Sequence, residues 1–480
     1  MKTILIQLFV LSSLISVSQN TFLNIYNDST FNIPGDITLL ESGNIIIPVS
    51  SQVDSISFPV LYKFNPNGEI INIEAIPNNP GDWSFIRNVL ICDDGNLITF
   101  GATYSGNSTV YNLWILKMDT SFNILNEHIY YTGLNYIEKF NSIIDSFGNV
   151  ILFCHSNMPY PLDHSFIFKL NQEGDSLYAK IYDNQNGQWA LDILQKKDNT
   201  GYYLFSQWPQ FGSATNNDIV EVDNNFEIVE VTGHTNSINN NTALWYNDTS
   251  FIICGQKINS VSDTTYKLGV TIVDTAGTII NEYFWGRPDT MINPAGSISL
   301  EMNNDFIYFA GTYNLIFPGT PTNITWIVLN KLDSNLNPIW QKFIGGNNFY
   351  YINSIKVCDD GSSYLTGRYV DLQTPNEYAP FFLAKVGPNG EFLSNEKLPQ
   401  NIMEVKLYPN PGIDYFMIDV KLASHKGKLQ LYDIQGKLCG NYNLTNGSNK
   451  INTTVLNSGI YILNIIENNT VVLSTKWVKK

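Results

Sequence analysis

The sequence has few cysteines and few positive charges for its 480 residues. Its five cysteines are odd in number and widely spaced: Cys92, Cys154, Cys254, Cys358 and Cys439. This pattern excludes a dense disulfide framework and the close pairs of zinc and redox motifs, so we expect buried free thiols. The formal charge of −16 argues against nucleic acid and anionic membranes as partners, because phosphate binding needs clustered Lys and Arg.

Motifs of catalysis and of metal binding are also missing. The sequence contains no GxSxG and no HExxH, and its five histidines are scattered. The pairs Asp93–Asp94 and Asp359–Asp360 lack the ladder of oxygen ligands that a calcium loop requires, so we interpret them as turn residues. We therefore predict no catalytic residue, no metal and no cofactor, although a triad formed in space stays possible.

Long segments with helical spacing are absent, and a repeat takes their place. Residues 91–101 read ICDDGNLITFG, and residues 357–367 read VCDDGSSYLTG. Related turn segments follow short apolar runs throughout the chain, with spacings of 52, 53, 53, 48, 56 and 56 residues; they are marked by Gly43, Gly95, Gly148, Gly201, Thr249, Asp305 and Gly361. A regular period of this length indicates a repeat architecture.

Each repeat contains four apolar runs of strand length, separated by turns rich in Asn, Asp and Gly. Four strands per repeat and seven repeats predict an all-β chain with a seven-bladed β-propeller over residues 19–400. The segment Thr21–Asn27 resembles the fourth strand of a repeat. We expect it to complete the last blade and so close the ring.

The N-terminus has the form of a secretory signal peptide over residues 1–18. Lys2 precedes an apolar run from Ile4 to Val17, and small residues at Ser16 and Ser18 suit cleavage after Ser18. A transmembrane anchor is the alternative, but the run is short for a bilayer.

The last 79 residues differ in composition from the rest. Residues 402–480 carry 9 Lys and 5 acidic residues, a net charge of +4, whereas the preceding residues carry −20. Such a reversal marks a domain boundary. Seven short apolar runs in this segment predict a small seven-stranded β-sandwich of the Ig-like type.

This segment resembles the type A C-terminal sorting domain of the type IX secretion system of Bacteroidota. The matching blocks are LYPNP at 407–411, LQLYDIQGKL at 429–438, LNSGIYILNI at 456–465 and KWVKK at 476–480. The sorting-motif residues are Leu407, Tyr408, Pro409, Asn410, Pro411, Gly436, Gly459, Tyr461, Lys476, Lys479 and Lys480. A generic interaction sandwich is the alternative.

The resemblance implies a route and partners. The chain would reach the periplasm and then cross the outer membrane through the type IX secretion machinery, to be secreted or held on the cell surface. After removal of the sorting domain, such proteins are often attached to surface lipopolysaccharide.

One aromatic position recurs twelve residues before the turn marker, in the loop that we expect to cross between blades. It holds Phe31, Trp83, Tyr136, Trp189 and Phe349. Exposed rings there could bind a glycan or a protein, and packing between blades is the alternative. We predict a non-catalytic binding module. The alternatives are a polysaccharide hydrolase or lyase with acidic residues at the channel, or a purely structural surface protein.

Overall fold

The structure is a computed structural model, and it divides into two compact units, Met1–Asn395 and Glu396–Lys480. The residues that it describes are 21–26, 30–53, 56–77, 82–105, 110–134, 137, 139–157, 163–182, 189–207, 217–234, 238–258, 266–287, 290–316, 321–373, 379–392, 406–420, 426–433, 437–467 and 470–480. All regular elements in these ranges are strands, so the predicted all-β class is confirmed. Within the same ranges there is no helix that could span a membrane. The predicted signal peptide, residues 1–18, lies outside them.

The described residues of the first unit form seven antiparallel sheets, numbered here in chain order. The first sheet comprises β2 (Phe31–Pro34), β3 (Thr38–Leu39), β4 (Ile45–Val53), β5 (Ile56–Phe64) and β6 (Ile70–Ala75). The second comprises β7 (Asp82–Ile91), β8 (Leu97–Ser105), β9 (Tyr111–Met118) and β10 (Ile124–Leu134). The third comprises β11 (Lys139–Ile144), β12 (Val150–Asn157), β13 (Asp163–Leu170) and β14 (Ser176–Tyr182).

The remaining four sheets follow the same plan. The fourth comprises β15 (Trp189–Gln195), β16 (Gly201–Gln207), β17 (Asn217–Asp223) and β18 (Ile228–His234). The fifth comprises β19 (Ile238–Asn247), β20 (Ser250–Ile258), β21 (Tyr266–Asp274) and β22 (Ile279–Trp285). The sixth comprises β23 (Ile292–Pro294), β24 (Leu300–Asn303), β25 (Phe306–Tyr313), β26 (Trp326–Asp333) and β27 (Pro338–Gly345). The seventh comprises β28 (Phe349–Val357), β29 (Ser363–Val370), β30 (Phe381–Val386) and β1 (Phe22–Tyr26).

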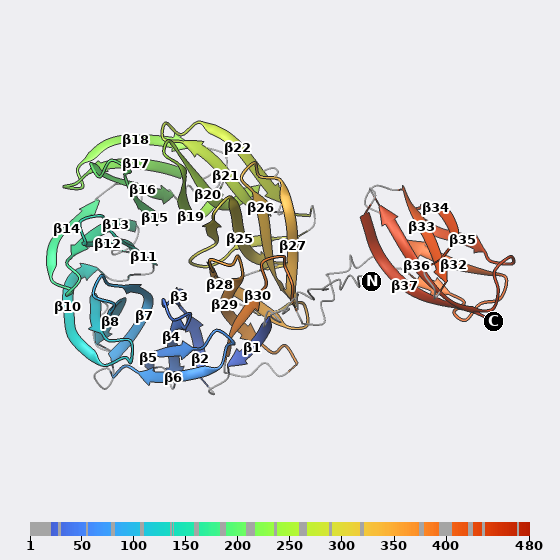
Figure 1. The fold of residues 1–480 in the computed structure, drawn as a ribbon, viewed down its shortest axis with the longest axis horizontal. Coiled ribbons are helices and arrows are strands. Elements are labelled where there is room, and N and C mark those ends of the chain that lie inside the picture. Colours follow the sequence, from blue (N-terminus) through green and yellow to red (C-terminus); the bar gives the residue numbers. More distant parts are fainter. Residues whose placement is uncertain are drawn as a thin grey trace, which may run out of the picture. The chain divides into compact units, whose positions relative to one another are not determined.

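The seven sheets are arranged in a propeller-like ring (Figure 1). The first strand of each sheet lies toward the middle of the ring and the fourth lies on its outside. Apolar clusters of buried side chains span neighbouring sheets; one of them joins Phe100 and Ile115 of the second sheet to Leu152 and Phe166 of the third. The core of this unit therefore lies largely between sheets.

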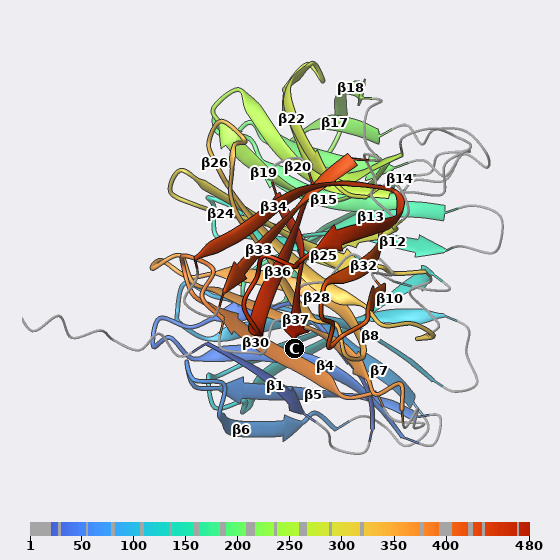
Figure 2. The same cartoon turned by 90° about the vertical axis from the view of Figure 1, so that its right-hand side faces the viewer.

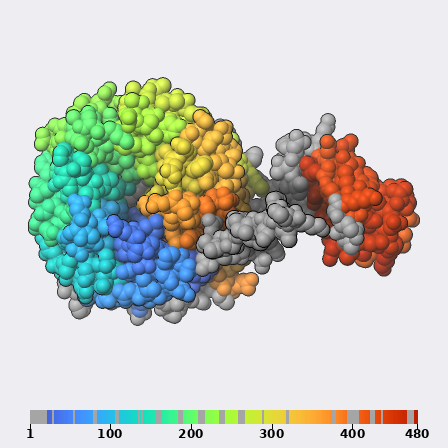
Figure 3. Space-filling view, in the orientation of Figure 1, coloured from blue at the N-terminus to red at the C-terminus, as the bar shows by residue number. Residues whose placement is uncertain are grey.

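Strand β1 closes the ring, as the sequence predicted. It pairs antiparallel with β30, with Phe22 opposite Lys385 and Tyr26 opposite Phe381. The N-terminal end of the chain thereby supplies the outermost strand of the last sheet, and the first and last sheets lie side by side in the space-filling view (Figure 3, blue and orange).

The turns between third and fourth strands use one chemical device. In six sheets an Asn or Asp side chain accepts hydrogen bonds with Oδ1 from the backbone N–H groups two and four residues later; these are Asn65, Asp119, Asn171, Asp223, Asp274 and Asp333. Such side chains hold a tight turn in place of a backbone partner. The repeated Asn and Asp residues are therefore structural at these positions.

One turn of the repeat differs from its predicted form. The sequence predicts a turn residue at Gly201, but Gly201 begins β16, and Asn199 takes the positive φ of 60° in that turn.

All five cysteines are free, with Cys92, Cys154 and Cys254 buried and Cys358 and Cys439 partly buried. The thiols thus act as small apolar groups.

Seven strands in two sheets make up the described part of the second unit. One has the order β31 (Lys406–Tyr408), β32 (Tyr415–Val420) and β35 (Gly447–Asn452). The other has the order β34 (Leu438–Thr445), β33 (Lys426–Asp433), β36 (Gly459–Glu467) and β37 (Thr470–Lys479), shown in red in Figure 2. Phe416 and Ile418 of the first sheet and Leu431, Leu463 and Trp477 of the second share one core.

Candidate functional site

The innermost strands of the ring are irregular at one level, and this irregularity forms the site. In the first sheet the inner strand breaks between β2 and β3, and in the sixth it breaks between β23 and β24. In the second and seventh sheets, bulges fall between Ile86 and Asn88 and between Ile352 and Ser354. A bulge changes the direction in which a side chain points, and here it frees Arg87 and Asn353 from the ladder.

Glycines make these irregularities possible, because they let backbones approach closely. A Cβ atom on Gly35, in the break of the first sheet, would lie 2.2 Å from the carbonyl oxygen of Arg87. A Cβ atom on Gly367, opposite the bulge of β28, would lie 2.1 Å from the carbonyl oxygen of Tyr351. Both distances are far below van der Waals contact, so these positions require glycine.

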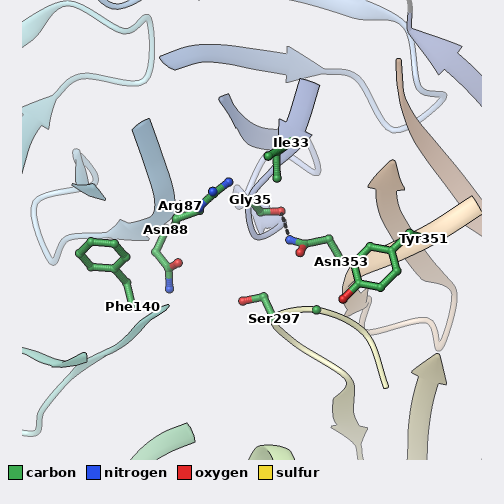
Figure 4. Close-up of a pocket in the computed structure, with 9 residues that line it drawn as sticks. Ile33, Gly35, Arg87, Asn88, Phe140, Ser297, Tyr351 and Asn353 are labelled. Atoms are coloured by element: carbon green, nitrogen blue, oxygen red, sulfur yellow. Dashed lines mark hydrogen bonds between the residues drawn. The ribbon is translucent and has the colours of Figure 1, made fainter. Parts of the chain in front are cut away.

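A cavity of roughly 200 Å³ lies where the breaks and bulges meet. Its described lining residues are Ile33, Gly35, Arg87, Asn88, Phe140, Gly296, Ser297, Tyr351 and Asn353. They come from the inner strands of the first, second, third, sixth and seventh sheets and from the breaks in them, and their side chains surround a common opening (Figure 4). The cavity is therefore central to the ring and built by sheets that are distant in sequence.

Hydrogen bonds between sheets hold the wall of this cavity. The backbone N–H of Asp36 donates to the carbonyl of Arg87 at 2.9 Å, and that of Ser297 donates to the carbonyl of Asn353 at 2.7 Å. The Asn353 side-chain amide donates to the carbonyl of Gly35 at 3.2 Å, as Figure 4 shows. Because these bonds satisfy backbone groups at the breaks, the irregular inner strands are stable.

The chemistry of the lining is that of hydrogen-bond donors and one guanidinium. The Arg87 guanidinium stacks 4.9 Å from the ring centroid of Phe85 and reaches Ser50 Oγ of the first sheet at 3.4 Å. Asn88 donates to Ser142 Oγ at 3.3 Å, and burial raises the pKa of the Tyr351 hydroxyl. No carboxylate is among the described residues that line the cavity.

The structure does not place the predicted aromatic residues in a loop between sheets. Phe31, Trp189 and Phe349 begin β2, β15 and β28, and Trp83 is the second residue of β7. Tyr136 lies outside the described residues.

The surroundings of these rings differ. Phe349 is fully buried, so the expectation of an exposed ring is wrong there, and it packs in a cluster with Phe31. Phe31 itself lies under the guanidinium of Arg368, and Trp83 contacts the ring of Tyr104. Phe349 and Phe31 thus pack where the seventh sheet meets the first, whereas Trp83 contacts a residue of its own sheet. A ligand-binding role of these residues stays a prediction.

The acidic turn Asp93–Asp94–Gly95 of the second sheet connects this sheet to the third. Lys117 Nζ lies 2.7 Å from Asp94 Oδ2 and also contacts Glu173 Oε1 of the third sheet. Gln172, from the same turn as Glu173, exchanges two hydrogen bonds of 2.7 Å with Asp93. In the related acidic turn of the seventh sheet, Asp360 accepts hydrogen bonds from the backbone N–H and the hydroxyl of Ser362. The described residues contain no group of three or more His, Cys, Asp or Glu that could hold a metal.

The two ends of the second unit bind each other through the sorting-motif residues. Trp477 is fully buried, and its Nε1 donates to the carbonyl of Pro409 at 3.0 Å. Asn410 accepts from the N–H of Val478 at 3.0 Å and donates to the carbonyl of Lys476 at 2.9 Å. The PNP turn is thus attached to the C-terminal strand, a contact that sequence spacing alone did not reveal.

The other motif residues have different surroundings. Tyr461 is buried and donates to the carbonyl of Asn457 at 2.8 Å, and buried Lys479 contacts the carbonyl of Thr453. Tyr408, Lys476 and Lys480 are exposed, and Gly459 opens β36. Leu407 packs against the core, while Gly436 lies outside the described residues.

Comparisons with known structures find weak likeness to several solved proteins. A neuraminidase-like protein of A/little yellow-shouldered bat/Guatemala shares 10% identity over 64% of this chain and 95% of its own, with a TM-score of 0.38. Drosophila plexin A, solved with semaphorin 1b, shares 8% over 76% and 86%, with a TM-score of 0.43. A protein of unknown function from Dyadobacter fermentans shares 10% over 76% and 98%, with a TM-score of 0.41. Because these likenesses are weak, they indicate no function for the ring, and only its own residues can.

Sequence comparisons add a result for the second unit. No curated protein matches the chain. Residues 406–480 match the family model described as "Secretion system C-terminal sorting domain". This region therefore carries a C-terminal sorting domain of the type IX secretion system, as the sequence predicted.

Proposed function

We propose that this chain is an exported protein whose ring is a seven-bladed β-propeller that binds a glycan or protein ligand in its central cavity without catalysis. The sorting domain indicates export through the type IX secretion system. The observation that supports binding is the cavity itself, where breaks and bulges of inner strands bring polar side chains of separate sheets together. Concave sites with a few convergent polar groups are typical of ligand sites.

The export route extends this proposal at both ends of the chain. Residues 1–18 act as a signal peptide to the periplasm, and the second unit, a β-sandwich of seven strands, is recognised by the secretion machinery. The mature protein is then secreted or held on the cell surface through lipopolysaccharide. A small folded module with its two ends hydrogen-bonded together suits recognition as a unit.

A binding screen with the full mature protein tests the ligand part. Immobilised glycans and surface proteins are probed with the wild type and with Asn88→Ala and Ser297→Ala, which change the cavity lining. Asn281→Ala is the matched control, because Asn281 is exposed on β22, outside the cavity lining, where it donates to the turn carbonyl of Asn335 and accepts from the backbone N–H of Glu282. We expect a ligand whose binding is weakened by the cavity variants alone.

Two results would contradict the proposal. If Asn281→Ala weakened ligand binding as much as the cavity variants do, the cavity would not be the binding site. Release of hydrolysis or elimination products from a bound glycan would replace the binding module by the alternative, a polysaccharide-acting enzyme, which needs two carboxylates flanking the scissile bond.

A further inference from the structure

Arginine is rare in this protein, and its use is uniform. Only three of the 27 Lys and Arg residues are arginines. Each has its guanidinium over an aromatic ring, with centroid distances of 4.9 Å for Arg87 on Phe85, 5.9 Å for Arg287 on Tyr313 and 4.9 Å for Arg368 on Phe31. Stacking occupies the face of a guanidinium and directs its N–H groups sideways, where they can bind a carboxylate through two parallel hydrogen bonds, which a lysine cannot do.

Arg368 lies next to the central cavity. It is directly opposite Tyr351 on the neighbouring strand, and opposite residues of an antiparallel pair project on the same face. Tyr351 lines the cavity. Phe31, which carries the guanidinium, is two residues before Ile33, a second lining residue, so both side chains project on the same face of β2. Arg368 and Tyr351 therefore stand together where the seventh sheet meets the first.

The charge of Arg368 has no partner among the residues that the structure describes. No carboxylate there lies within ion-pair distance of it, and its buried Nε atom has no hydrogen-bond acceptor. Burial lowers the pKa of its guanidinium, which shows that the charge is partly removed from water. A buried donor without an acceptor is costly, so an anion that supplied one would be bound favourably.

We propose that the cavity binds an acidic sugar of the uronate type, with its carboxylate on Arg368 and the Tyr351 hydroxyl and its hydroxyl groups on Asn88 and Ser297. This assignment rests on the proposed function and narrows its ligand class. The cavity is smaller than the roughly 300–1,000 Å³ of sites for drug-sized ligands, which suits a single sugar ring. Amide and hydroxyl groups on the wall match sugar hydroxyls, and the stacked guanidinium matches a carboxylate.

The acidic net charge of the chain does not oppose this site at close range. At physiological salt, charges beyond about 8 Å are largely screened. The local charges among the described residues are then the guanidiniums of Arg368 and Arg87 and the buried carboxylate of Asp36 beside Gly35, two positive groups and one negative. Arg87 lines the same cavity from the second sheet. The site thus combines a local positive charge with an otherwise acidic protein.

Calorimetric titration of the full mature protein with matched sugars tests this proposal. The probes are oligogalacturonate, its methyl ester, which has the same sugar without charge, and neutral galacto-oligosaccharide. We expect the wild type to bind oligogalacturonate at least tenfold more tightly than either neutral probe, since a charge-assisted bond contributes on the order of one decade or more. Added salt should weaken only the binding of the acid.

Variants identify the residue. Arg368→Gln should lose about tenfold or more in affinity for oligogalacturonate and leave the weak neutral binding unchanged, and Arg368→Lys should recover part of it. Arg287→Gln is the matched control: Arg287 also stacks on an aromatic ring, but that ring, Tyr313, is paired with Ile292 and Trp326, which do not line the cavity, whereas Arg368 is paired with Tyr351, which does. Thermal unfolding of each variant confirms that the ring is intact.

Several results would overturn the inference. Equal affinity for the acid and its methyl ester, or unchanged affinity in Arg368→Gln, excludes a carboxylate site while leaving a glycan-binding function in place. Acetate is titrated as a fourth probe, and an affinity equal to that of oligogalacturonate shows a simple anion site and excludes the sugar. If neither charged nor neutral sugars bind while a protein ligand does, the ligand class is wrong, and if nothing in the wider screen binds, the proposed function fails as well.

Discussion

At the scale of single residues, Lys117 shows how the repeated acidic turn works. Its side chain is 4% exposed, whereas its partners Asp94 and Glu173 are 45% and 58% exposed. The cation is thus the buried member of the group, and the two acids supply its compensation from two sheets. Removing the acids leaves a buried charge without a partner, whereas removing the cation leaves acids that water can solvate.

This asymmetry gives a testable order of stabilities. We expect the double variant Asp94→Asn with Glu173→Gln to lower the free energy of unfolding by about 3 kcal/mol. Lys117→Met keeps the volume and should cost less than about 1.5 kcal/mol. Urea unfolding of the three proteins checks the order. A Lys117→Met variant less stable than the double variant would contradict the assignment of the lysine as the buried charge.

The same group predicts a dependence on pH. The hydrogen bond that Asp94 accepts from Lys117 lowers the pKa of its carboxyl group to about 2, below the ordinary value of about 3.9. Because the folded pKa is the lower one, the stabilisation is complete above the ordinary pKa and is lost as pH falls toward 2. Unfolding free energies measured between pH 5 and pH 2 should therefore fall less steeply in Asp94→Asn than in the wild type. Parallel curves of unfolding free energy against pH would show that Asp94 does not contribute to the loss of stability in acid.

At the scale of elements, β1 fastens the ring through Tyr26. Its ring lies 5.0 Å from that of Phe64 in the first sheet and 5.1 Å from that of Phe381 in the seventh. Its hydroxyl donates to the carbonyl of Gly68 at 2.5 Å. One side chain therefore joins the closing strand to both sheets at the seam.

Two substitutions separate the contributions of Tyr26. Tyr26→Phe removes the hydrogen bond and should cost about 1 kcal/mol, and Tyr26→Ala also removes the ring and should cost about 3 kcal/mol. Tyr131→Ala on β10 is the control, because Tyr131 is 79% exposed and should change stability by less than about 0.5 kcal/mol. Comparable losses of unfolding free energy at Tyr26 and Tyr131 would show that the contacts of Tyr26 between the first and seventh sheets contribute no extra stability.

The elements of this fold were largely predictable and the site was not. Apolar runs with Asn, Asp and Gly turns repeat seven times in the sequence, and the segment at Thr21 resembles a fourth strand, so strand order and closure follow from local patterns. The cavity depends on bulges at Arg87 and Asn353, and bulges are set by strand register, which a single sequence does not state.

Signals for the breaks were nevertheless present. The stretches NIPGD at 32–36 and INPAG at 292–296 each put a proline within a strand, and proline marks an interruption or an edge. The recurring aromatic position was expected in a loop just before each first strand, and at its four described residues it lies within that strand instead. It did not reveal that Phe349 is buried or that Arg368 covers Phe31, because both depend on the neighbouring sheet.

At the scale of the whole molecule, the two units carry opposite charge and separate tasks. The ring holds the candidate ligand site, and the second unit holds the sorting domain. Each has a core of its own, since no apolar cluster mixes residues of the two units among the residues described. Removal of one unit should therefore leave the packing of the other intact.

This independence makes export the clearest test at this scale. On the proposed export route, a chain without residues 402–480 should accumulate in the periplasm, because it keeps the proposed signal peptide at residues 1–18 and lacks the sorting domain. Cell fractionation and surface protease digestion of the wild type and the truncated chain measure delivery. Resistance of the periplasmic ring to added protease, equal to that of the exported wild type, shows that loss of export does not reflect misfolding. Delivery of the truncated chain to the surface at wild-type levels would show that the sorting domain is not the export signal.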